Sequence, residues 1–86
     1  MFNIIERYIN KLTKDDVNNF ALKKNINLSE EELNFTYNFV KKNYKEMLGN
    51  PKLFDIYRYQ SNYSKENFNK IAKVYNEYFQ IYSNYL

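Results

Sequence analysis

The sequence predicts an all-α fold, a compact bundle of four to five helices. Apolar residues recur at three- and four-residue steps through most of the chain, which is the spacing of one face of a helix. Hydroxyl residues followed three positions later by an acid mark helix starts. Glycine occurs once, and alternating apolar runs typical of strands are missing. Because 86 residues are too few for two cores, we expect a single domain, residues 1–86.

The first two expected helices are short. Helical spacing of apolar residues defines the first, about residues 2–11, through Ile4, Ile5, Tyr8, Ile9 and Leu12. Thr13 with Asp16 marks the start of the second, which runs to about Lys24 and buries Val17, Phe20 and Ala21. Asn25 can adopt the left-handed conformation that ends a helix, so residues 26–28 form a tight connector. Ile26 and Leu28 are expected to face the core.

The third helix has the clearest start signal. Ser29 and Glu32 form a capping box, in which each side chain accepts a hydrogen bond from the other residue's backbone N–H. One apolar face then continues for about five turns; it comprises Leu33, Tyr37, Val40, Tyr44, Met47 and Leu48. Gly49, with Asn50 and Pro51 behind it, ends this helix.

Two more helices are expected in residues 50–86. Asn50 as a cap and Pro51 at the first helical position predict a short helix; its apolar residues are Leu53, Phe54, Ile56 and Tyr57. The polar run 60–62 ends it, and Ser64 begins the last helix, about residues 65–84. Its predicted core face comprises Phe68, Ile71, Ala72, Tyr75, Phe79, Tyr82 and Leu86.

These elements resemble a small uncharacterised family of Firmicutes proteins, the YqfT-like domain of unknown function. The resemblance rests on the segment 12–17 (Leu-Thr-Lys-Asp-Asp-Val), on the connector 25–29 (Asn-Ile-Asn-Leu-Ser) with Glu32, and on a closing helix from about Ser64 to Phe79. It implies a helical fold and a Gram-positive source of low G+C content. The resemblance implies no activity, cofactor or partner.

The composition argues against an enzyme. Histidine and cysteine are absent, which removes the usual general base at neutral pH, the Ser-His and Cys-His pairs and most zinc ligands. The acidic clusters 15–16 and 30–32 lie in the first turns of helices, where they favour the helix dipole. A single glycine excludes a glycine-rich phosphate loop. We therefore expect neither catalysis, nor a cofactor, nor a bound metal.

The first residues bear on location. The apolar run at the N-terminus is interrupted by Glu6 and Arg7, and it is too short for a secretory signal or a membrane span. We therefore expect a cytoplasmic protein.

A second apolar stripe on the last helix is the main functional clue. Val74, Tyr78, Ile81 and Tyr85 adjoin the core face and widen the apolar arc to over half of the circumference. Such a surface suits a protein partner or a second copy of the chain. On the third helix Phe35 and Phe39 form a comparable pair opposite its core face. The alternative is that both helices are central and buried on two sides, which would place both stripes in the core.

Nucleic-acid binding is the second functional hypothesis. Residues 13–48 are predicted to form helix, connector and helix, as in a helix-turn-helix. The expected reading end carries Glu30, Glu31 and Glu32, which would repel phosphates. Lysines near the other end of that helix are the phosphate-contact candidates: Lys41, Lys42, Lys45 and Lys52. With a net charge of +3 spread over both halves, the chain has no dense basic stripe.

Overall fold

The computed structural model describes residues 2–49 and 54–83. They form the α-helices α1 (Phe2–Lys11), α2 (Lys14–Lys23), α3 (Glu30–Gly49) and α4 (Lys65–Ser83), and the short 3₁₀ helix η1 (Ile56–Asn62) between α3 and α4. No strand occurs in these two ranges. The predicted all-α bundle of four to five helices is confirmed.

The predicted helix starts and the turn after α2 are present as hydrogen bonds and backbone angles. Thr13 and Asp16 exchange side-chain to backbone bonds of 3.0 and 3.1 Å. Ser29 and Glu32 do the same at 2.8 and 3.1 Å. Asn25 has a φ of 62°, the left-handed conformation expected after α2. These local signals depend on few neighbours, which is why they can be identified from the sequence.

The short helix differs from its prediction. Its N-cap is Asp55, whose carboxylate accepts the backbone N–H of Tyr57 at 3.0 Å, and the helix is of the 3₁₀ type. Residues 60–62, predicted as a break, belong to it. The expected cap and first turn, Asn50 and Pro51, lie outside the described residues. An Asp side chain satisfies the free N–H groups at a helix start as well as Asn does, so the start signal was assigned to the wrong residue.

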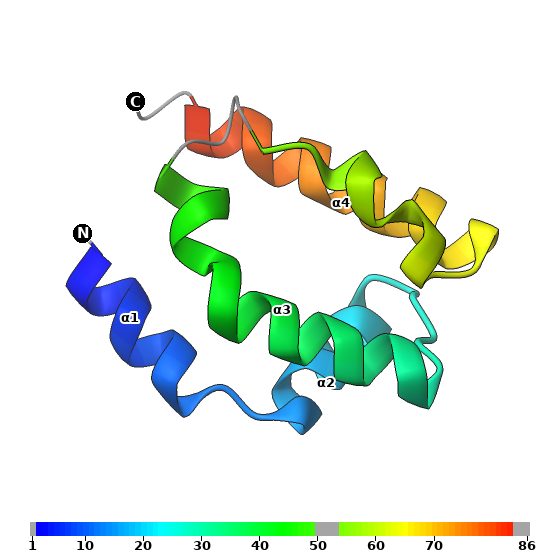
Figure 1. Ribbon diagram of the computed structural model, residues 1–86, viewed down its shortest axis with the longest axis horizontal. Helices are drawn as coiled ribbons and strands as arrows, with labels where there is room; N and C mark the ends of the chain where they lie inside the picture. Colours follow the sequence, from blue (N-terminus) through cyan, green and yellow to red (C-terminus); the bar gives the residue numbers. More distant parts are fainter. Residues whose placement is uncertain (1, 50–53, 84–86) are drawn as a thin grey trace.

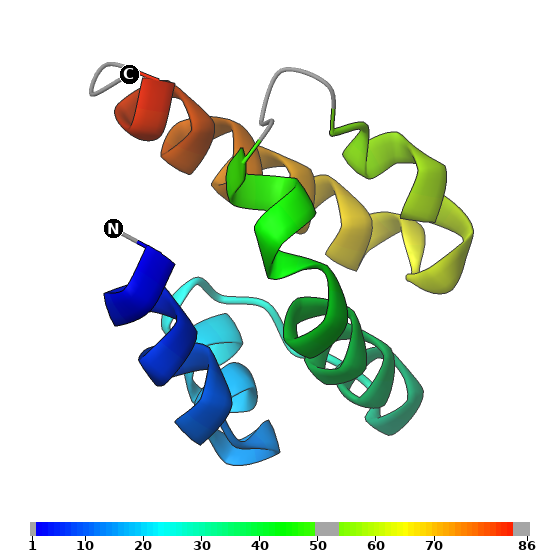
Figure 2. The same cartoon turned by 60° about the vertical axis from the view of Figure 1, so that its left-hand side comes forward.

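The helices are arranged around α3. Figures 1 and 2 show α1 and α2 on one side of α3, and η1 with α4 on the other. Direct packing joins α1 and α2 to α3, and it joins η1 to α4. The beginning of α1 and the end of α4 lie toward the same end of the molecule (Figure 1). The chain thus has two layers that share α3.

Each side of α3 has its own packed cluster. Toward α1 and α2, Ile9, Leu12 and Tyr44 are buried together, with Val17 and Val40 packed against them. Toward η1, the aromatic rings of α3 meet those of residues 54–63; the closest pair is Phe39 and Tyr59, whose centroids are 4.6 Å apart. The side chain of Phe68 on α4 is 1% exposed. For α3, the arrangement agrees with the alternative of a central helix that packs on two sides.

No helix among the described residues is both long enough and apolar enough to cross a membrane.

Candidate functional site

An apolar cavity of about 370 Å³ lies between the two layers. Side chains from every described helix line it: Tyr8 and Ile9 of α1, and Leu12 directly after it; Asp16, Val17, Phe20 and Ala21 of α2; Ile26 and Leu28 of the connector; Thr36, Val40 and Met47 of α3; Ile56 and Tyr63 of η1 and its C-cap; and Ile71, Val74, Tyr75 and Tyr78 of α4. The cavity is partly open to solvent. We refer to it as the groove. Its volume and its lining are those of a binding site, whereas most protein cores contain few voids larger than a water molecule.

The groove exists because α2 and α4 rest on different neighbours. Packing holds α2 on α3 and α4 on η1, so the space between α2 and α4 must be filled by side chains. On α2 the residues that face this space include the small Val17 and Ala21. On α4 Ala72 is buried outside the lining, and the half-buried Val74 faces the groove. The small side chains on the α2 wall leave part of this volume open.

Three aromatic residues that line the groove are also largely exposed. The exposed fractions are 66% for Tyr8 on α1, 47% for Phe20 on α2 and 45% for Tyr78 on α4. The rings of Phe20 and Tyr78 meet across the opening with centroids 6.1 Å apart. We call these three residues the aromatic rim. Large apolar side chains that remain exposed around an apolar cavity are typical of interaction sites.

A positive charge lies at this rim. The ammonium nitrogen of Lys24 is 5.9 Å from the ring centroid of Phe20 and 5.3 Å from that of Tyr78. Both distances allow cation–π attraction, which holds the ammonium over the two rings. In the described part of the chain Lys24 forms no ion pair. The groove therefore combines an apolar interior with a cation at its mouth.

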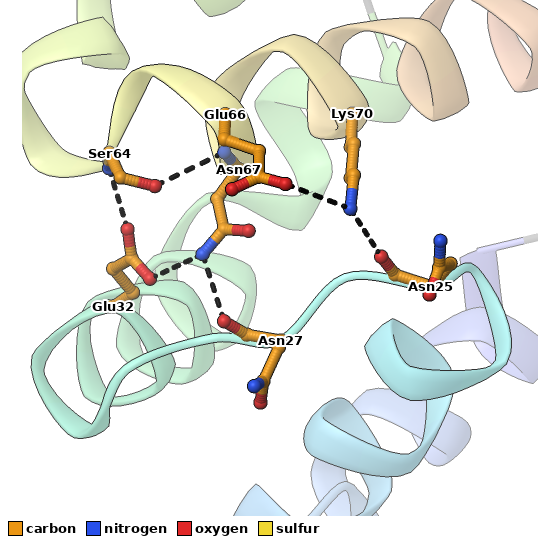
Figure 3. Close-up of polar contacts among 7 residues, drawn as sticks. All are labelled: Asn25, Asn27, Glu32, Ser64, Glu66, Asn67 and Lys70. Carbon is orange, nitrogen blue, oxygen red and sulfur yellow. Dashed lines mark hydrogen bonds and ion pairs between the residues drawn. The ribbon is translucent and has the colours of Figure 1, made fainter.

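The opposite end of α4 is fixed by buried polar contacts (Figure 3). The Glu32 carboxylate accepts backbone N–H groups from Ser29 at 2.8 Å and Ser64 at 2.7 Å, and it accepts the Asn67 side-chain amide at 2.8 Å. The same amide donates to the carbonyl of Asn27 at 2.9 Å. Glu32 is 6% exposed and Asn67 is 9% exposed. We call these five residues the polar latch, because they join the starts of α3 and α4 to the connector.

Hydrogen bonding outweighs burial at Glu32. Burial by itself would raise the pKa of this carboxyl, but its bonds from Ser29, Ser64 and Asn67 hold the pKa below the ordinary value of 4.5. Next to the latch, Lys70 donates to the carbonyl of Asn25 at 2.9 Å and lies 3.6 Å from the Glu66 carboxylate. The bonds to the carbonyls of Asn25 and Asn27 thus attach the first half of α4 to the connector.

A second polar pair is part of the groove wall. The Thr36 hydroxyl lies 2.7 Å from the Glu32 carbonyl, to which it donates, and 2.6 Å from the Tyr63 hydroxyl. Burial raises the pKa of the Tyr63 phenol, and the negative charge of Glu32 raises it further, while the bond with Thr36 lowers it. These hydroxyl groups are used in internal bonds, so they do not make the groove polar.

The described residues hold no arrangement suited to metal binding. In ranges 2–49 and 54–83 no three His, Cys, Asp or Glu side chains gather where they could coordinate an ion. The one buried carboxylate, Glu32, already accepts three hydrogen bonds. The arrangement can bind an apolar group and attract an anion.

Comparison with known proteins adds no further guide. No family model, no curated protein and no solved structure matches this chain. Membership of the YqfT-like family therefore stays a prediction.

The groove contains part of the apolar stripe predicted on the last helix. Val74 and Tyr78 both line it. Ile81 lies in the last turns of α4, but its side chain is outside the described residues, and Tyr85 lies outside them altogether. The structure thus brings two predicted partner-binding residues together at one site.

The predicted pair on α3 lies elsewhere. Phe35 and Phe39 stack with centroids 5.9 Å apart, and both contact the ring of Tyr59. Phe39 also meets Phe54 at 5.8 Å. Residues 54–63 pack against these rings and leave both half-buried. Partner binding through this pair stays a prediction. Helical periodicity indicated the correct face but could not show that a later segment packs on it.

Only some lysines of the predicted patch are exposed without a contact to another helix. The Lys41 ammonium donates to the Asn10 carbonyl of α1 at 3.1 Å and lies 5.5 Å from the Tyr37 ring centroid. Lys42 and Lys45 are exposed on α3, and Lys52 is outside the described residues. Lys41 therefore acts between α1 and α3, and two of the four candidates remain on the described surface.

Sequence reasoning did not find the aromatic rim as a site. The spacing predicts that Phe20 belongs to a buried stripe and Tyr8 to the apolar side of the first helix, because both stand at core spacing. Lys24 marks only the end of the second helix in the sequence. A periodic pattern indicates which residues share a face, but it does not show whether another element covers that face.

Proposed function

We propose that this protein is a non-enzymatic interaction module that receives an amphipathic helix of another protein in its groove. The observation that carries the proposal is the apolar cavity with Tyr8, Phe20 and Tyr78 exposed around its mouth. Helix-in-groove recognition places apolar side chains at positions i, i+4 and i+7 into such a cavity. A helix of about 16 residues is about 24 Å long, which is shorter than the longest extent of the molecule, 32 Å.

The proposal extends the interpretation of Val74 and Tyr78 as partner-binding residues. Aromatic side chains at the centre of an interface contribute much of its binding energy. The polar latch supports this role, because it holds the first half of α4 in place and leaves the half with Val74 and Tyr78 to form the groove wall. A preformed groove lowers the entropy cost of binding.

The test is a titration with an uncharged probe. The probe is a helical peptide of about 16 residues. Leucines at positions i, i+4 and i+7 form its apolar face, and glutamines stand at the border of this face. Nuclear magnetic resonance shifts should change at Val17, Ala21 and Val74, which line the groove. Tyr78→Ala should weaken binding about tenfold, whereas Tyr57→Ala, an exposed tyrosine outside the lining, should not.

A groove-filling substitution gives an independent check. Ala21→Phe adds a phenyl ring where the cavity is open, so it should abolish peptide binding with the fold intact. Ala72→Phe adds the same ring at a buried position outside the lining and should destabilise the protein by about 1–3 kcal/mol through overpacking. Equal destabilisation by both would mean that no cavity exists.

Other outcomes would overturn the proposal. Absence of saturable shifts up to about 1 mM peptide would exclude useful affinity. Shifts centred on α3 residues outside the lining would place the site elsewhere. Light scattering that shows a concentration-dependent dimer, lost with Tyr78→Ala, would make a second copy the occupant in place of another protein.

Nucleic-acid binding stays a prediction without support from an observed site. Lys41 is bonded to α1, and the exposed Lys42 and Lys45 do not line the groove.

A further inference from the structure

The charge at the mouth of the groove narrows the kind of helix that can bind. Lys24 follows the last residue of α2, and its ammonium lies over the rings of Phe20 and Tyr78, at 5.9 and 5.3 Å from their centroids. Two walls of the groove therefore share one cation. A partner that covers these rings must also cover this charge or lie next to it.

The acidic residue that lines the groove does not form an ion pair with Lys24. Asp16 also lines the groove, but its carboxylate accepts the backbone N–H of Thr13 at 3.0 Å, at the opposite end of α2. The ion pair of the described residues joins Lys70 to Glu66. Removing water from an ammonium without giving it an anion costs free energy, so a partner that supplies a carboxylate is favoured.

We infer that the partner helix is acidic at one end of its apolar face, where a carboxylate pairs with Lys24. The inference rests on the proposed function. The apolar part of the same helix covers Phe20 and Tyr78 and continues toward Tyr8. One turn before Tyr8 on the same face of α1, Ile4 is 77% exposed and extends the exposed apolar surface. The carboxylate thus fixes which end of the bound helix lies near α4.

Charge also argues against a second copy as the occupant. A two-fold symmetric pair brings the same patch of both copies together. Each copy has a net charge of +3 and presents Lys24 at the opening. Like charges at a partly desolvated interface oppose association, whereas a complementary acidic helix relieves the charge.

Three peptides test the inference. They are identical to the neutral probe except that the border residue next to the last leucine is Gln, Glu or Lys. With the natural protein, we expect the Glu peptide to bind about tenfold tighter than the Lys peptide, and the Gln peptide to lie between them. The difference should largely disappear at about 1 M salt, where the screening length is about 3 Å.

Matched variants assign the effect to one side chain. Lys24→Glu should reverse the order of the Glu and Lys peptides, and Lys24→Gln should make their affinities nearly equal. Lys23→Glu changes the net charge by the same amount one residue earlier, on an exposed lysine outside the lining. It should preserve the order. Circular dichroism checks that each variant keeps its helices.

The outcomes separate the inference from the proposed function. If the Gln peptide binds but Lys24→Glu leaves the order unchanged, the inference is wrong and the groove remains a helix-binding site. If Lys23→Glu reverses the order equally, overall charge selects the peptide, which also overturns the inference. If no peptide binds, the proposed function fails together with it.

Discussion

The polar latch makes the stability of the fold depend on one carboxylate, and Glu32→Gln tests this dependence. The substitution keeps the size of the side chain, so no cavity forms. One oxygen survives and can still accept from Ser29 and Asn67. The other oxygen is replaced by an NH₂ group that faces the backbone N–H of Ser64. In the natural protein, the nitrogen of Ser64 lies 2.7 Å from this Glu32 oxygen. Two donors then meet and one bond to a charged acceptor is lost.

The expected loss follows from these contacts. A hydrogen bond to a charged group contributes about 1.5–3 kcal/mol, and a neutral one about 0.5–1.5 kcal/mol. Glu32→Gln removes one charged bond and converts two others to neutral ones, while it removes the cost of burying the charge. We expect a net loss of about 3 kcal/mol in the free energy of unfolding. A protein of this size has a total of roughly 4–13 kcal/mol.

Urea unfolding at pH 7 followed by circular dichroism measures this loss. In a thermal scan it corresponds to a decrease of about 12–24 °C in Tm. Glu31→Gln is the matched control, since Glu31 is exposed in the same first turn of α3. Its loss should not exceed about 1 kcal/mol, the value of an acid near a helix N-terminus. Similar losses for both variants would refute the structural role of the latch.

Acidification gives a second readout of the same carboxylate. The pKa of Glu32 in the folded protein is below the ordinary value of 4.5, so the unfolded chain takes up the proton first as the pH falls. The contribution of Glu32 is complete above about pH 4.5 and decreases as the pH falls through the folded-state pKa. The stability difference between the natural protein and Glu32→Gln should therefore shrink on acidification. A stability difference that stays constant down to about pH 3 would contradict this reasoning.

Four further substitutions, at three positions, test the rest of the fold. Asn25→Ala should cost about 1 kcal/mol and Asn25→Gly almost nothing, because the φ of 62° at this position suits glycine; equal effects in urea unfolding would contradict this. Tyr63→Phe should cost about 1 kcal/mol by removing the bond to Thr36, and an absorbance titration of the natural protein should show one more late-ionising tyrosine than the variant. Because the Tyr63 pKa is raised, its contribution is present below pH 10 and lost as the pH rises further. Phe68→Ala should cost about 3–5 kcal/mol, as its side chain is 1% exposed, and a loss below about 1 kcal/mol would refute its place in the core.

The sequence by itself determined the local structure. The capping boxes at Thr13 and Ser29, the left-handed Asn25 and the start of α4 at Ser64 were all predicted, because each depends on residues a few positions apart. Periodicity also indicated the apolar faces, including buried Ile26, Tyr44 and Phe68. The start of η1 was misplaced, since Asp55 and Asn50 carry similar cap signals.

Only the tertiary structure decided which apolar faces are covered. Phe35 and Phe39 carry the same kind of signal as Val74 and Tyr78, yet residues 54–63 pack on the first pair, while the second pair lines an open groove. The polar latch likewise joins Glu32 to Ser64 and Asn67, which are more than 30 positions away. Contacts at such separations depend on which helices meet, and the spacing of apolar residues within one helix does not say which other helix packs on it.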